Sequence, residues 1–205
     1  MMCFRHTLRG LVLAGLMTAT CAAVESGNAI AQTAGPISST LVPADFPVPT
    51  SATGTGFRIV PLSPALAKID YDAYMSSIEH LQKTFSRSTS WPHDGITDAD
   101  TIADMENEQS RFQARKSFAY AVLTPDGKRE RGCVYVRPSS VPGYDAQVVL
   151  WVTQAEYDAG FDAELYAFVQ DWMASDWPFA KVAYPGRAID WATWDATVEA
   201  AKIKG

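Results

Sequence analysis

His80 is the side chain in this sequence whose chemistry best suits proton transfer near neutral pH. An imidazole can bind a substrate by hydrogen bonds or take a proton from it. Ser76 and Ser77 lie within one helical turn of His80 but do not complete a hydrolase triad, and the chain contains no Gly-x-Ser-x-Gly motif. His80 is therefore a candidate catalytic residue, with a structural role on a helix surface as the open alternative.

Other groups that could do chemistry are sparse. Cys133 begins an apolar, strand-like run, which favours a small core residue over a nucleophile. His80 and His93 are the histidines beyond the first 31 residues, and no Cys/His cluster has zinc-ligand spacing, so no metal is predicted. Glu106 and Glu108 could act as bases, but solvated charge on a helix is the favoured interpretation.

The composition is that of an ordinary globular protein. The chain has 205 residues, a formal net charge of -6, 47% hydrophobic and 20% charged residues. Binding a phosphate backbone needs clustered Lys and Arg. The densest basic segment, 128–131, is interrupted by Glu130, so no nucleic-acid partner is predicted.

The first 31 residues have the pattern of a secretory signal peptide. Arg5 and Arg9 give a basic start, and Leu11 to Ala23 forms an apolar run too short to span a membrane comfortably. A small-x-small pattern then predicts cleavage before Gln32. The protein is therefore expected to be exported, periplasmic or extracellular, with no membrane contact after cleavage.

The remaining chain divides into two parts. Residues 32–56 are rich in Pro, Ser, Thr, Gly and Ala and are predicted to form a flexible linker. Residues 57–205 are predicted to form one folded domain. Within the leader, Cys21 is a poor candidate for lipidation, and separated arginines do not make a twin-arginine signal.

Hydrophobic periodicity and turn signals predict the elements of this domain. A Thr97–Asp100 capping box is expected to open its second helix, with Ile102, Met105 and Phe112 buried and Glu108 facing water. The predicted order is a strand at 57–62, a helix from 64 or 70 to 85, a helix at 97–116, strands at 118–123, 131–137 and 145–153, a helix at 154–175, a strand at 181–184, and a last short helix.

That order, and several segments, resemble the GNAT N-acetyltransferases over residues 57–190. The matching segments are Asp70–His80, Phe118–Leu123, Gly132–Val136 and Trp177–Phe179. The resemblance implies an α/β fold: a mixed, mostly antiparallel sheet flanked by helices, in the order strand-helix-helix-strand-strand-strand-helix-strand, with a truncated C-terminus.

The resemblance also implies a cofactor site. Acetyl-CoA would serve as cosubstrate, without a metal, in a cleft between two splayed central strands. Its pantetheine would pair with the strand that ends at Trp151, Val152 and Thr153, and its pyrophosphate would lie on amides at the following helix N-terminus. Gly160 and Phe161 belong to the same expected site.

On the acceptor side, the resemblance assigns Trp91 and His93 to the loop that binds the substrate, a small-molecule or peptide amine. His80 would assist proton removal. Tyr184 could supply the phenol that protonates the leaving thiolate, or it could be a core or rim aromatic.

The cofactor loop departs from the family pattern. Tyr157 stands where the family usually has its first loop glycine, and Glu156, Asp158 and Asp162 add negative charge beside the expected pyrophosphate. The segment 138–180 contains no Lys or Arg to offset them. Two functions therefore stay open: an acyl-CoA-dependent N-acyltransferase, and a non-catalytic GNAT-like module that binds a ligand or an envelope partner.

Overall fold

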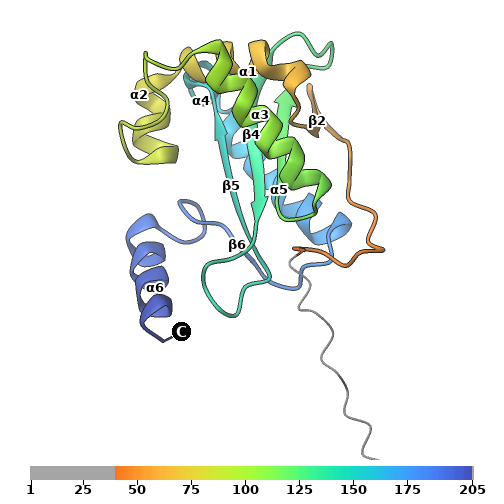
Figure 1. The fold of residues 1–205 in the computed structure, drawn as a ribbon, viewed down its shortest axis with the longest axis vertical. Helices are drawn as coiled ribbons and strands as arrows, with labels where there is room; N and C mark the ends of the chain where they lie inside the picture. Colours follow the sequence, from red (N-terminus) through yellow and green to blue (C-terminus); the bar gives the residue numbers. More distant parts are fainter. Residues whose placement is uncertain (1–39, 205) are drawn as a thin grey trace, which may run out of the picture. The chain divides into compact units, whose positions relative to one another are not determined.

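The structure, a computed structural model, describes residues 40–204 of the chain (Figure 1). The predicted signal peptide at 1–31, and the predicted linker as far as residue 39, lie outside the described residues. Within residues 40–204, no helix combines the length and apolar character needed to cross a bilayer.

A six-stranded sheet forms the centre of the domain, with its strands ordered as they occur along the chain. Neighbouring strands are antiparallel, except that β5 and β6 are parallel. The sequence predicts β2 to β6 but misses the short β1. The strands are β1 (Ala52–Gly54), β2 (Phe57–Pro61), β3 (Phe118–Leu123), β4 (Glu130–Arg137), β5 (Ala146–Val152) and β6 (Val182–Ala183).

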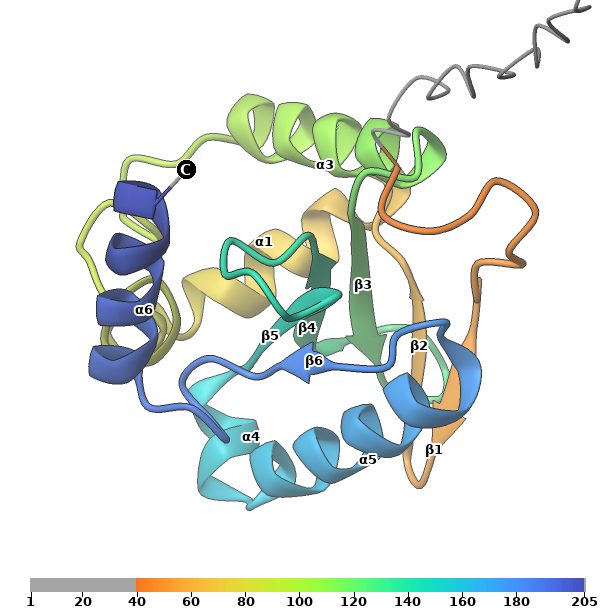
Figure 2. The ribbon, with the colours of Figure 1, turned by 90° about the horizontal axis from the view of Figure 1, so that it is seen from below.

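Helices cover both faces of the sheet (Figure 2). One face carries η1 (Pro64–Leu66), α1 (Ala67–Met75), α2 (Ile78–Leu81), the π-helical turn η2 (Gln82–Ser86) and α3 (Asp98–Gln113). The opposite face carries α4 (Gln154–Asp158) and α5 (Phe161–Asp176), and α6 (Trp191–Lys204) follows β6. This is the α/β arrangement of a mostly antiparallel sheet flanked by helices that the sequence predicts.

Two apolar layers hold these elements together because side chains alternate between the faces of each strand. Tyr120 and Val134 point toward α5, while Ala121 and Cys133 point toward α1 and α3, and all four are fully buried. A smaller cluster around Trp194 attaches α6 to the loop before β5. The β3–β4 pair therefore lies at the centre of the core.

The segment 40–56, predicted as flexible linker, packs against the domain instead. Val42 is 2% exposed, and its burial contributes about 1.5–3 kcal/mol. The Leu41 amide donates to the Arg115 carbonyl at 2.7 Å, and the Arg115 guanidinium donates to the Phe46 carbonyl at 2.7 Å. The predicted start of the folded domain is therefore too late: prolines prevent regular structure but do not prevent packing.

Two of the predicted helices are interrupted. The first breaks between α1 and α2, where the Ser76 hydroxyl donates to the Ala73 carbonyl at 2.7 Å and competes with the helical ladder. The third breaks between α4 and α5 at Gly160, whose φ of 82° ends α4 in the left-handed region. Both breaks lie beside the end of β5 and shape the loop around it.

The capping box of α3 is present, with Thr97 accepting from the Asp100 amide and Asp100 accepting from the Thr97 amide. Met105 is buried as predicted. The predicted burial of Ile102 and the predicted exposure of Glu108 are both wrong: Ile102 is 44% exposed and Glu108 is 9% exposed. The helix therefore sits rotated from the position that its apolar residues predict.

Candidate functional site

A cavity of about 350 Å³ lies where β5 and β6 separate. The two strands pair only at Ala146 with Val182 and at Gln147 with Ala183. Beyond those pairs β5 continues to Val152, while the chain after β6 turns away. The cavity has the size that small-molecule sites occupy, and we call it the cleft. It is enclosed by the open end of the strand pair, the α2–η2 segment and residues 185–191.

Backbone groups of β5 face the cleft. The Thr153 amide donates to the Arg131 carbonyl of β4 at 3.0 Å. Residues at every second position of β5, Trp151 among them, therefore also direct their N–H and C=O groups toward β4. Because that direction alternates along an antiparallel pair, Leu150 and Val152 direct theirs to the opposite edge. β6 does not pair with this part of β5, so a ligand can bind there.

His80 lies in the cleft, half-buried, with its ring 5.0 Å from the ring of Tyr157. Burial lowers the pKa of the His80 imidazole below 6.5, against the opposing effects of the Asp162 carboxylate and a hydrogen bond to the Val152 carbonyl. His80 is therefore neutral at pH 7. With one nitrogen donating to Val152, the other can accept a proton.

The cleft also contains charged side chains. Asp162 and Arg187 form a two-pronged ion pair, with Arg187 Nη2 2.6 Å from Asp162 Oδ1. Lys83 lines the cleft and forms no ion pair with any of residues 40–204. Lys83 is thus the lining cation whose charge remains available to an anionic ligand.

The loop after β5 satisfies several of its own amides. The Ser77 hydroxyl accepts from the Gln154 amide at 2.9 Å, and the Thr153 hydroxyl accepts from the Glu156 amide at 3.3 Å. These donors open α4, where the family resemblance implies a pyrophosphate. Thr153 therefore caps a helix rather than presenting its side chain to the cleft.

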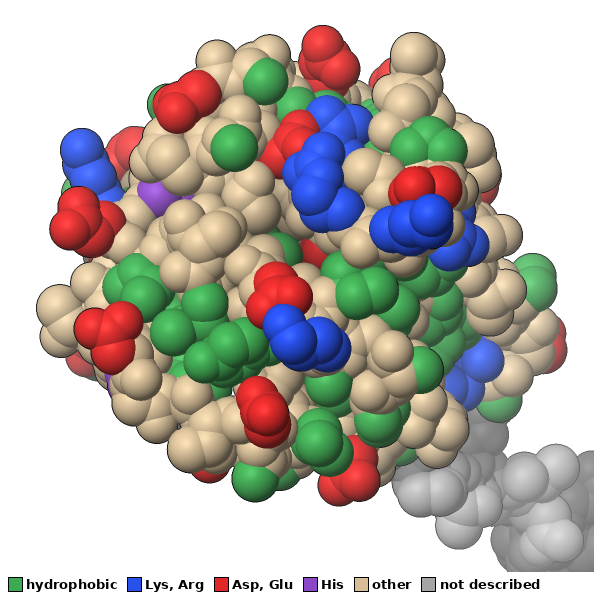
Figure 3. Space-filling model, turned by 90° about the horizontal axis from the view of Figure 1, so that it is seen from above, with side chains coloured by type: hydrophobic (Ala, Val, Ile, Leu, Met, Phe, Trp, Pro, Cys, Tyr) green, Lys and Arg blue, Asp and Glu red, His purple; other side chains and the backbone are tan. Residues whose placement is uncertain are grey.

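Glu156 is not the uncompensated charge that its local sequence suggests. It is 6% exposed and accepts from Arg129 at 2.6 Å and from Arg131 at 2.9 Å. Burial opposes its ionisation, but the hydrogen bonds from Arg131 and Arg129 outweigh burial and lower the pKa of the Glu156 carboxyl. On the face drawn in Figure 3, basic side chains generally lie beside acidic ones.

Two other expected site residues lie in the core. Phe161 is 2% exposed, packs edge-on against Phe57 at 5.2 Å and lies beneath the Arg131 guanidinium. Tyr184 packs against Tyr166 at 5.6 Å, and burial raises its pKa to about 12. Neither residue lines the cleft, so the structure does not place the Tyr184 phenol at a leaving thiolate.

Trp91 and His93 line a second cavity, of about 460 Å³, between α1 and α3. The Trp91 ring lies 5.2 Å from Tyr74 and 6.2 Å from Trp151, which lines the cleft. Trp91 thus separates the two cavities. The structure brings His80, Trp151 and Val152 together in the cleft and leaves Trp91 and His93 in the adjacent cavity.

Several cleft residues escape prediction from the sequence, among them Lys83, Arg187 and Trp191. Trp191 lies against Gly186, whose φ of 75° and lack of a Cβ allow the ring to approach. Arg87 stacks over the Trp191 ring at 4.0 Å and pairs with Asp195 of α6. The contacts of Arg87 join segments that are about 100 residues apart in the sequence, and no local motif predicts them.

No protein-family model and no curated protein matches the sequence. Solved acetyltransferase structures do match. A protein assigned as an acetyltransferase matches with a TM-score of 0.52 and 9% identity over 65% of this chain and 72% of its own. The ribosomal-protein-S5-alanine acetyltransferase from Vibrio fischeri matches with a TM-score of 0.50 and 13% identity over 61% of this chain and 67% of its own.

A third match, the RimL ribosomal L7/L12 alpha-N-protein acetyltransferase, has a TM-score of 0.46 and 11% identity over 62% of this chain. The present chain spans 66% of that protein's length, slightly less than two thirds. With the strand order and the separated β5 and β6 strands, the likeness to the first two structures shows that this chain has a GNAT-like fold.

Proposed function

We propose that the cleft binds an acyl-CoA thioester and that the protein transfers the acyl group to an amine of a small molecule or a peptide. The observation that carries this proposal is the unpaired edge of β5 at Leu150–Val152, with neutral His80 beside it. The acetyltransferase names of the structural matches support the reaction class.

The proposed reaction needs a base at the amine. The amine nitrogen forms a bond to the acyl carbon, the carbon–sulfur bond breaks, and the amine proton passes to His80 and leaves with the thiol. A neutral imidazole held by the Val152 carbonyl suits that role because its second nitrogen can accept. The Leu150 peptide group and the Val152 amide would orient the pantetheine arm, since the Val152 carbonyl accepts from His80.

The diphosphate of acyl-CoA would bind at a different place from the one that the family resemblance implies. The Gln154 and Glu156 amides at the start of α4 already donate to Ser77 and Thr153. Lys83 is the lining cation that could interact with phosphate instead. We therefore expect Lys83, rather than the first turn of α4, to carry the salt-dependent part of the affinity.

Calorimetric titration of residues 32–205 with acetyl-CoA tests the proposal. We expect saturable micromolar binding that Lys83→Ala weakens, with a smaller salt dependence. Lys68→Ala, which removes an exposed lysine paired with Asp72 on α1, is the matched control and should leave binding unchanged. Absence of heat at millimolar acetyl-CoA would rule out an acyl-CoA site.

A second function is a non-catalytic ligand-binding module. The bond between Ser77 and the Gln154 amide favours it, since a protein hydroxyl occupies a donor that a phosphate would use. Only the acyltransferase would release free thiol from acetyl-CoA when an amine is present. Acetyl-CoA binding without thiol release, across a panel of small amines and peptide N-termini, would favour the module.

A further inference from the structure

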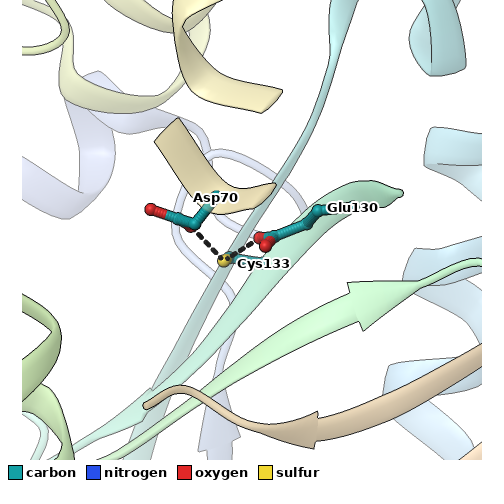
Figure 4. A group of neighbouring side chains, drawn as sticks. All are labelled: Asp70, Glu130 and Cys133. Atoms are coloured by element: carbon teal, nitrogen blue, oxygen red, sulfur yellow. Dashed lines mark hydrogen bonds between the residues drawn. The ribbon is translucent and has the colours of Figure 1, made fainter. Parts of the chain in front are cut away.

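Three proton-bearing side chains meet in the core between α1 and β4, away from the cleft (Figure 4). Asp70, Glu130 and Cys133 each offer a ligand atom, and these atoms lie within 4.8 Å of one another. The Cys133 sulfur lies 2.8 Å from Glu130 Oε1 and 3.6 Å from Asp70 Oδ1. Asp70 is 4% exposed, Glu130 1% and Cys133 0%.

The fold brings Glu130 into this cluster through an irregularity in β4. Val122 pairs with Gly132, but Leu123 pairs with Glu130, so Arg131 is an extra residue on the β4 side. Such a β-bulge re-aims the side chains around it. It turns Glu130 toward the face that carries Cys133, where Asp70 of α1 packs.

The cluster is not satisfied by its own hydrogen bonds. Glu130 Oε2 is buried and has no hydrogen-bond partner among residues 40–204. A single thiol proton can form one good hydrogen bond, although both carboxyl groups lie within reach of the sulfur. A buried carboxylate oxygen without a partner is costly, so Glu130 Oε2 remains able to bind a cation.

We propose that Asp70, Glu130 and Cys133 form a binding site for one zinc ion. Zinc accepts thiolate sulfur and carboxylate oxygen together. With Zn–S of about 2.3 Å and Zn–O of about 2.0–2.2 Å, tetrahedral geometry separates S and O by about 3.5 Å. The observed 3.6 Å between Cys133 Sγ and Asp70 Oδ1 meets this requirement. Glu130 Oε1, 2.8 Å from Sγ, is too close to the sulfur for both atoms to be tetrahedral ligands. Glu130 would therefore ligate through its unpartnered Oε2, and water would complete the coordination.

A surface cavity lies beside Glu130, but Asp70 and Cys133 do not line it. Glu130 lines a cavity of about 430 Å³ between α1, the β3–β4 hairpin and the start of α4. Lys128 and Arg129 line the same cavity, and their positive charge opposes the entry of a cation, so slow exchange of the ion is expected. The other ionisable groups facing the cluster are Asp104 of α3 and the phenols of Tyr74 and Tyr135.

Cobalt absorption tests the site directly. Chelator-treated protein is titrated with Co²⁺, once in the folded state and once during refolding from denaturant. We expect a thiolate-to-cobalt charge-transfer band that saturates at one equivalent and that Zn²⁺ abolishes by displacement. Zn²⁺ should also raise the Tm, because it binds the folded state alone.

Variants locate the ion. Cys133→Ser should abolish the band, and Asp70→Asn should weaken Zn²⁺ binding by about 10- to 100-fold. Glu106→Gln, at an exposed position on α3, is the matched control and should behave as wild type. Unfolding curves of metal-free variants confirm that each is folded before titration.

The wild-type spectrum alone can overturn the proposal. If neither protocol gives the band at saturating Co²⁺, and Zn²⁺ leaves the Tm unchanged, the three groups share protons and bind no metal. A band that survives in Cys133→Ser would place the ion elsewhere and overturn the assignment equally. A band seen only after refolding with metal supports the site and shows that the folded cluster is closed to exchange.

Discussion

His80 and Glu156 show how partners distant in the sequence set the chemistry of single residues. His80 reaches the Val152 carbonyl 72 positions later, which orients its ring in the cleft. Glu156 is held by Arg129 and Arg131, which precede it by 27 and 25 positions. The basicity of His80 and the ionisation of Glu156 therefore depend on contacts that exist only in the folded chain.

Replacing His80 with Gln should lower acetyl transfer by about 10²- to 10⁴-fold, the usual contribution of a general base. Burial lowers the pKa of His80 below the usual 6.5, so wild-type kcat/KM should decline on the acidic side with a midpoint below that of an ordinary imidazole, as the ring becomes protonated. The variant should lose this acidic limb. Thiol release across a pH series measures both effects, and an unchanged profile would exclude His80 as the base.

Replacing Glu156 with Gln should destabilise the fold by about 2–3 kcal/mol, because two arginines lose a buried partner. The folded pKa of Glu156 is lowered, so its contribution is present above its unfolded pKa and is lost as pH falls through the folded value. Urea unfolding at pH 7 and pH 3 should therefore show a smaller difference between variant and wild type at pH 3. Asp158→Asn, at an exposed position, should change stability by less than about 0.5 kcal/mol at either pH.

At the scale of elements, the β4–β5 pair positions both the cleft and the buried cluster. Gly132 permits the close approach of the strands: a Cβ placed there would lie 2.0 Å from the Trp151 carbonyl oxygen and 2.8 Å from Val152 Cα. Glu130 and Cys133 on β4 and Trp151 on β5 depend on the same pairing.

Gly132→Ala should therefore cost more than an ordinary glycine substitution, about 2–3 kcal/mol, because the added methyl group meets backbone. Gly143→Ala is the control, since its Cβ would meet nothing within 4 Å and only its φ of 90° opposes the change. We expect about 1 kcal/mol for the control. Equal losses in urea unfolding would contradict the close approach of β4 and β5.

The sequence predicts the strands β2 to β6 well because each is an aromatic or β-branched run bounded by turn residues. It predicts two continuous helices, whereas the structure interrupts them at Ser76 and Gly160. The apolar periodicity continues across both positions, and the breaks arise from the Ser76 hydrogen bond and the left-handed Gly160 backbone of the folded chain. The acid cluster is missed because Asp70 and Cys133 lie 63 positions apart and a bulge re-aims Glu130.

At the scale of the whole molecule, the predicted signal peptide stays a prediction, and we propose that the protein is exported. Expressed in a bacterial host, it should appear outside the cytoplasm with Gln32 as its N-terminus, measured by intact mass. Ala31→Phe should block cleavage, because the site needs a small residue there, while Ala34→Phe should not. Full-length protein retained in the cytoplasm would contradict the proposal.

The GNAT-like fold could be predicted from the order of elements, and the cleft from the fold. The affinity of the cleft could not, because the charges around it depend on Lys83, Asp162 and Arg187. These side chains come from three separate segments. Their grouping emerges only when η2, α5 and the segment after β6 meet around the open end of β5.

Amide chemical-shift mapping with acetyl-CoA tests most directly whether the edge of β5 binds the thioester. Saturating acetyl-CoA should shift the amides of Leu150 and Val152 and the His80 ring, and should leave the amides around Asp70 and Glu130 unchanged. Shifts confined to other surfaces, or none at millimolar acetyl-CoA, would contradict the account.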